Sequence, residues 1–123
     1  GALKLLHIGD AGYGGGQAFT AAARRHGGFD LALLPIGAYE PVSFMADSHM
    51  SPAEAVKAMA DAKAACALAH HFGSFQLGFE SHDAPVKALH AARGAAGLSE
   101  TRFAALQPGQ ALLLRAGACH APG

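Results

Sequence analysis

The sequence has few cysteines, no excess charge of either sign and no long hydrophobic run, and each shortage excludes a class of protein. Cys66 and Cys119 are too few and too far apart for a disulfide framework or a C-x-x-C metal site, so we expect two free thiols. Nine basic residues balance nine acidic ones, which leaves no basic field for nucleic acid or anionic membranes. No apolar run approaches a bilayer span and no signal-like segment opens the chain, which predicts a cytoplasmic protein.

The hydrophobic residues, 51% of the 123, are sufficient for one small domain with a buried core. Apolar runs typical of strands alternate with stretches of helical spacing. The strands are expected at residues 2–9, 29–37, 66–71, 103–106 and 110–115, and the helices at 17–26, 52–65 and 84–96. This alternation predicts an α/β fold with a largely parallel sheet and about three helices.

Two of the expected helices have recognisable starts. Ser51, Pro52 and Glu54 form the pattern of a capping box with proline at the first helical position. Asp83 is expected to cap the last helix with its side chain.

Polar residues follow the first three expected strands. Asp10 lies between two glycines after the first strand, in the stretch "LLHIGDAGYG", and His70 and His71 end the third. The irregular segment 38–50, which contains His49, follows the second. The carboxyl ends of parallel strands meet at one edge of a sheet, and a carboxylate with histidines there suits zinc, iron or manganese.

Simpler interpretations of these residues remain open. Asp10 can be a turn residue that bonds its own loop, and His49 a loop histidine without a role. His70 and His71 are neighbours on a strand, so at most one of them faces the site. The loop "GDAGYGGG" lacks the register of a dinucleotide or P-loop motif, and no G-x-S-x-G marks a serine hydrolase.

The strings "GDAGYG", "FDLALLPIGAYEP", "SHMSPAEAV" and "HHFGSFQL", in this order, resemble the second half of a metallo-β-lactamase-fold hydrolase. The similarity extends from Leu5 to Leu77 and more loosely to Leu106. It is greatest to the branch that contains N-acyl phosphatidylethanolamine-hydrolysing phospholipase D. The sequence departs from that branch's pattern at four positions, where alanine, valine, phenylalanine and serine replace the usual threonine, arginine, tryptophan and threonine: Ala11, Val42, Phe72 and Ser74.

The resemblance implies an αββα sandwich of which residues 1–123 form the second half, with one mixed sheet. It implies that Asp10 bridges two divalent metal ions, zinc in first place and iron or manganese otherwise, and that His71 is the last histidine ligand. His49 corresponds to a catalytic histidine at the rim of the pocket, near bound substrate. The implied function is part of a dinuclear hydrolase, a phosphodiesterase of phospholipase D type acting on a small-molecule or lipid phosphodiester.

The H-x-H-x-D-H motif that opens this family's metal site is absent from the sequence. We therefore expect a partial domain that is inactive alone, whose apolar sheet face is covered by the N-terminal half, by another chain or by a second copy of itself. The alternative is a non-catalytic half-domain that acts as a binding or structural module.

Overall fold

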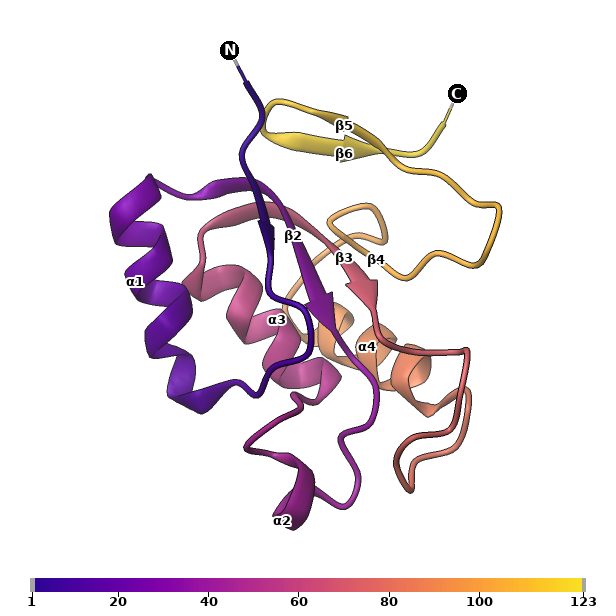
Figure 1. The fold of residues 1–123 in the computed structure, drawn as a ribbon. Coiled ribbons are helices and arrows are strands. Elements are labelled where there is room, and N and C mark those ends of the chain that lie inside the picture. The colour runs from indigo at the N-terminus through magenta and orange to yellow at the C-terminus, as the bar shows by residue number, and fades with distance from the viewer. Residues whose placement is uncertain (1, 123) are drawn as a thin grey trace.

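A computed structural model describes residues 2–122 of the chain (Figure 1). The strands are β1 (Leu5–His7), β2 (Phe29–Pro35), β3 (Ala64–His70), β4 (Phe103–Ala104), β5 (Leu113–Arg115) and β6 (Ala118–His120). The helices are the 3-10 turn η1 (Gly14–Gly16) and α1 (Gln17–His26), α2 (Val42–Met45), α3 (Pro52–Asp61) and α4 (Ala84–Ala95).

The first four strands form a parallel sheet in the order β1-β2-β3-β4. The order never reverses, so right-handed crossovers place α1, α3 and α4 on the same face of the sheet. On that face Ala32 pairs with Ala67 and Leu34 with Ala69, and all four side chains are buried. The α/β architecture predicted from the sequence is confirmed, with the antiparallel pairing confined to a separate hairpin of β5 and β6.

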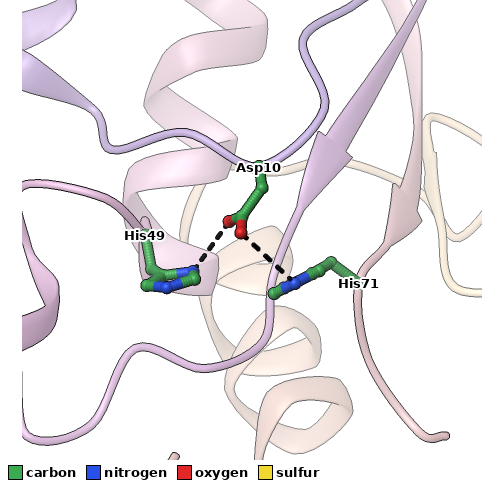
Figure 2. A group of neighbouring side chains, drawn as sticks. All are labelled: Asp10, His49 and His71. Atoms are coloured by element: carbon green, nitrogen blue, oxygen red, sulfur yellow. Dashed lines mark ion pairs between the residues drawn. The ribbon is translucent and has the colours of Figure 1, made fainter. Parts of the chain in front are cut away.

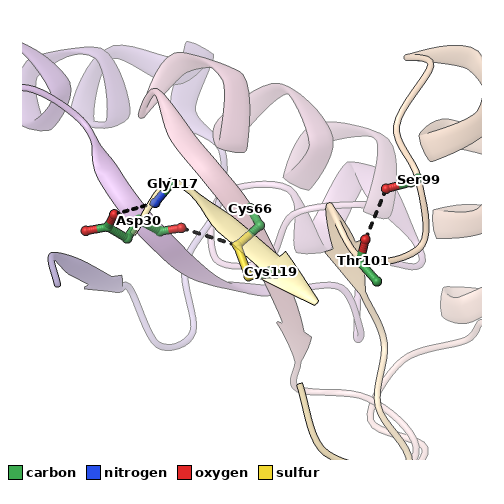
Figure 3. The surroundings of a disulfide bond; sticks show 6 residues. All are labelled: Asp30, Cys66, Ser99, Thr101, Gly117 and Cys119. Atoms are coloured by element: carbon green, nitrogen blue, oxygen red, sulfur yellow. Dashed lines mark hydrogen bonds between the residues drawn. A yellow bond between two sulfur atoms is a disulfide. The ribbon is translucent and has the colours of Figure 1, made fainter. Parts of the chain in front are cut away.

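The opposite face of the sheet is covered only in part. The β5–β6 hairpin lies across it, and the Cys66–Cys119 disulfide joins β6 to β3 (Figure 3). The expectation of free thiols is therefore wrong: the sequence separation hid that the hairpin returns Cys119 to the central strand. Toward the site end of this face Leu33 and Leu68 are only partly buried, and Leu5 at the start of β1 is 56% exposed.

Asp30 attaches the hairpin and the first strand to the sheet. Its carboxylate accepts a hydrogen bond from the backbone amide of Lys4, at 2.7 Å. It accepts a second one from the amide of Gly117, at 3.0 Å (Figure 3). These two bonds lower the pKa of Asp30 below its usual value; desolvation opposes the shift, and the charge of Lys4 adds to it.

Side-chain caps were predicted for two helices, and the structure contains one of them. The capping box before α3 is present, since Ser51 Oγ accepts from the Glu54 amide and Glu54 Oε2 accepts from the Ser51 amide. Asp83 precedes α4, but its side chain makes no cap bond. Its carboxylate instead accepts from Ser81 and pairs with Lys87 one turn later, so the expected side-chain cap is wrong.

Several element bounds also differ from expectation, and two elements are additional. The helix α3 ends at Asp61 rather than near residue 65, because Lys63 adopts a left-handed conformation that starts the turn into β3. Irregular segment 38–50 contains the short helix α2, and β6 adds a strand after residue 115. Within residues 2–122 no helix is both long and apolar enough to cross a membrane.

Candidate metal site

Asp10, His49 and His71 come from three separate loops and meet at the carboxyl edge of the parallel sheet (Figure 2). Asp10 follows β1, His49 lies between α2 and α3, and His71 comes directly after β3. The Asp10 side chain is 51% exposed, whereas those of His49 and His71 are 16% and 22% exposed. The cluster is therefore open to solvent on the aspartate side.

The two oxygens of Asp10 face different histidines. Asp10 Oδ1 lies 2.8 Å from His49 Nδ1, and Asp10 Oδ2 lies 3.6 Å from His71 Nε2 (Figure 2). One ligand atom from each of the three residues lies within 4.8 Å of the others. The imidazole rings of His49 and His71 stack on each other with centroids 5.5 Å apart.

The buried nitrogens of this cluster lack hydrogen-bond partners among the described residues. His49 Nδ1 and His71 Nδ1 are both buried without one, as is Nε2 of the neighbouring His70, and the short approach of His49 to Asp10 does not have hydrogen-bonding geometry. Buried polar atoms normally have a partner, so atoms left without one invite a ligand. Imidazole nitrogen with carboxylate oxygen is a donor set that zinc, iron and manganese accept. These residues therefore fit a metal ion.

Close backbone packing brings the Asp10 loop against the segment before His49. A Cβ atom at Gly12 would lie 2.5 Å from the carbonyl oxygen of Ala46 and 2.7 Å from that of Asp47, so only glycine fits. On the other side of the loop the Tyr13 hydroxyl donates to the Asp61 carboxylate at the end of α3. That hydrogen bond, with burial and the charge of Asp61, raises the pKa of Tyr13.

His71 has an unusual backbone conformation. Its φ is 60°, in the left-handed region that residues other than glycine rarely adopt. The carbonyl of His71 packs against Gly37, where a Cβ atom would collide with it. The β2 and β3 ends thus continue side by side past the sheet, as the bond from the Ile36 amide to the His70 carbonyl also shows.

His70 lies outside the cluster. It is the last residue of β3, and its ring stacks on His7 of β1 with centroids 5.2 Å apart. Burial lowers the pKa of His70, and the neighbouring His7 and His71 lower it further, while Asp10 opposes the shift. The structure thus brings only one of the two adjacent histidines to Asp10.

Sequence reasoning did not single out His7 or Glu80. The alternation of side chains along β1 and β3 would have placed His7 and His70 on the same face, given the strand order. The carboxylate of Glu80 binds two backbone amides of the loop after β2. No local sequence pattern marks such a long-range contact.

The chain is similar to known proteins at the level of a family and of individual relatives. Residues 1–72 match the family described as "Beta-lactamase superfamily domain". An uncharacterized protein of Mycobacterium tuberculosis is 41% identical over 87 residues, 68% of this chain and 22% of the relative.

Two relatives carry functional names. N-acyl-phosphatidylethanolamine-hydrolyzing phospholipase D 1 of Caenorhabditis elegans is 40% identical over 60 residues, 49% of this chain and 17% of its own length. The mitochondrial N-acyl-phosphatidylethanolamine-hydrolyzing phospholipase D of Saccharomyces cerevisiae is 40% identical over 77 residues, 62% of this chain and 16% of its own length. The chain thus spans about a fifth of the length of these relatives. The matches confirm the family resemblance that the sequence motifs predicted.

Proposed function

Because the chain belongs to the beta-lactamase superfamily, we propose that it is the part of a metal-dependent hydrolase that supplies Asp10, His49 and His71 to the reaction centre. The observation that carries this proposal is the convergence of one carboxylate and two imidazoles, with buried unpartnered nitrogens, at one edge of the sheet.

Each of the three side chains has a distinct proposed task. The two oxygens of Asp10 point to different neighbours, so this carboxylate is able to contact two cations at once. His71 would bind one of them through Nε2, the nitrogen nearest to Asp10. Two divalent ions bound there, zinc in first place and iron or manganese otherwise, would supply the Lewis acidity that generates hydroxide near neutral pH. His49 would stabilise negative charge that develops on the substrate.

A lipid or small-molecule phosphodiester is the proposed substrate. Two relatives are named as phospholipases D that hydrolyse N-acyl-phosphatidylethanolamine. Large apolar side chains are exposed on α2 and on the loop after β3, the two segments that lie next to the cluster. They are Val42, Phe44, Phe75, Leu77 and Phe79. Such a surface suits a substrate with an apolar portion.

The partly open face of the parallel sheet is the proposed contact for the rest of the enzyme. Leu5, Leu33 and Leu68 lie on this face beside the stacked rings of His7 and His70. We propose that residues 1–123 form a partial domain and that an N-terminal half carrying further metal ligands covers this face; a second copy of the chain is the other candidate. We also propose that the protein is cytoplasmic.

The experiment supplies the chain with an N-terminal half carrying H-x-H-x-D-H, joined to it or as a separate chain. Metal content and hydrolysis of an activated aryl phosphodiester should appear together and be lost together with a chelator. His49→Ala should lower turnover while metal content is retained. A reconstituted protein that binds metal stoichiometrically and hydrolyses no ester would favour a non-catalytic module instead.

Light scattering on the chain alone tests the proposed covered face. Self-association, or binding of a hydrophobic dye, is the expected result because part of the apolar face is open. A clean monomer without a dye signal would contradict a half-domain that needs a partner.

A further inference from the structure

The loop that begins at His71 is attached at both ends to the same neighbouring segment, residues 37–40 after β2. At its start, the carbonyl of His71 packs against Gly37. At its end, the amide of Phe79 donates to the Glu40 carbonyl at 2.9 Å. The loop is therefore closed on one support rather than projecting freely into solvent.

Glu80 makes the strongest attachment of that loop. Its Oε1 accepts from the Ala38 amide at 2.5 Å, and its Oε2 accepts from the Glu40 amide at 3.0 Å. Hydrogen bonds from backbone amides to an ionised carboxylate are about twice as strong as neutral ones. Gly78 allows this approach, because a Cβ atom there would lie 3.0 Å from the Glu40 carbonyl and would collide with the Glu80 carboxylate.

Two residues in these segments hold strained backbone conformations. Ala38 and His71 both have φ of 60°, and neither is glycine. Such conformations persist only where the surroundings fix them, and they concentrate at functional sites. The Glu80 carboxylate binds Ala38 directly, and the His71 carbonyl packs against the residue before Ala38.

We propose that Glu80 is a positioning residue for the candidate metal site, an inference that rests on the proposed function. It makes no hydrogen bond or ion pair with Asp10, His49 or His71 among residues 2–122. It acts by holding segment 37–40 against the start of the His71 loop. The left-handed backbone of His71 is thereby kept in the conformation that directs Nε2 toward Asp10.

The test compares Glu80→Ala and Glu80→Gln with the wild-type chain, and uses Glu100→Gln as the matched control. Glu100 is a glutamate with an 82% exposed side chain, and the one polar partner of its carboxylate within residues 2–122 is Arg93, at 3.5 Å. Three quantities are measured: amide exchange at Ala38 and Glu40, the NMR signals of His71 without metal, and Zn²⁺ affinity by titration.

Glu80→Ala should speed the exchange of both amides and shift the NMR signals of His71. It should also weaken Zn²⁺ binding by about tenfold, the smaller of the effects usually seen when a residue that supports a metal ligand is lost. Glu80→Gln keeps one acceptor oxygen, so it should show a smaller change of the same kind. Glu100→Gln should match the wild type. If Glu80→Ala does not fold, Glu80→Gln alone decides the question.

The inference is overturned if folded Glu80 variants leave the His71 signals and the Zn²⁺ affinity unchanged, even where global stability falls. Absence of any Zn²⁺ binding by the wild type, in the chain alone and in the reconstituted protein, would count against the proposed function. In that case the metal-free His71 signals still decide whether Glu80 fixes the backbone of this residue.

Discussion

Asp10 Oδ1 and His49 Nδ1 lie 2.8 Å apart although different loops carry them and the approach lacks hydrogen-bonding geometry. Two polar atoms that point toward the same space without bonding each other are both free for a third partner, which under the proposed function is a metal ion for Asp10 and the substrate for His49. The 2.8 Å separation of these two atoms depends on how closely the Asp10 loop packs on the segment before His49.

Gly12→Ala should separate Asp10 from His49. The new methyl group would meet the Ala46 and Asp47 carbonyl oxygens at 2.5 and 2.7 Å, so one of the two loops must move. We expect a loss of stability of about 1–3 kcal/mol, the usual cost of overpacking, together with weaker metal binding. Denaturation and metal titration measure the two effects.

Gly94→Ala is the control for that substitution. Gly94 lies within α4, and a Cβ atom there would meet nothing within 4 Å. Alanine should stabilise the helix by about 0.5–1 kcal/mol. Equal behaviour of the two alanine variants would show that the packing at Gly12 does not matter.

Ser51→Ala should lower the free energy of unfolding by about 1 kcal/mol, because it removes the oxygen that caps α3. Chemical denaturation gives the value. Pro52 and the rest of the helix are unchanged, so the fold should persist. An unchanged midpoint would mean that the observed capping box contributes nothing to stability.

Asp30→Asn should make the chain less stable at neutral pH but not at low pH. The folded state lowers the pKa of Asp30 below 3.8, so its ionised form contributes stability above the unfolded pKa. That contribution is lost as the pH falls through the folded pKa. The difference in unfolding free energy between wild type and variant should therefore shrink below about pH 4. A difference that is constant between pH 7 and pH 2 would contradict the assigned cause.

Reduction of the Cys66–Cys119 disulfide should lower stability by about 2–4 kcal/mol, since the bond closes a loop with a sequence separation of 53. Denaturation of oxidised and reduced chain measures the loss. Thiol titration of the unreduced protein is the control. Two reactive thiols in that titration would contradict the pairing seen in Figure 3.

Local sequence patterns predicted the features that depend on residues close together in the chain. The Ser51 capping box and the starts of α1 and β2 follow from cap chemistry and apolar spacing, and all three are found in the structure. The position of Asp10 after a strand follows from the same reasoning, because an apolar run closes with glycine immediately before it. The strand itself is exposed to half-buried rather than mostly buried as the apolar run predicted. Metal binding by Asp10 stays a prediction.

Long-range contacts were out of reach of those patterns. Cys119 reaches Cys66 only because the chain returns as a hairpin over the sheet, and no spacing rule indicates that return. Asp83 fits the residue preference of a helix cap, yet Ser81 and Lys87 compete successfully for its carboxylate. Glu80 likewise gains its role from amides on a distant loop.

The central claim is that Asp10 and His71, and not His70, hold metal. The most direct measurement is metal stoichiometry of Asp10→Asn, His71→Ala and His70→Ala in the protein reconstituted with its N-terminal half. Asp10→Asn should lose most bound metal, because a neutral amide cannot bridge two cations with negative charge, and His71→Ala should vacate one position. His70→Ala should retain metal, since its ring stacks on His7 outside the cluster. Full metal content in Asp10→Asn, or loss in His70→Ala with retention in His71→Ala, would contradict the account.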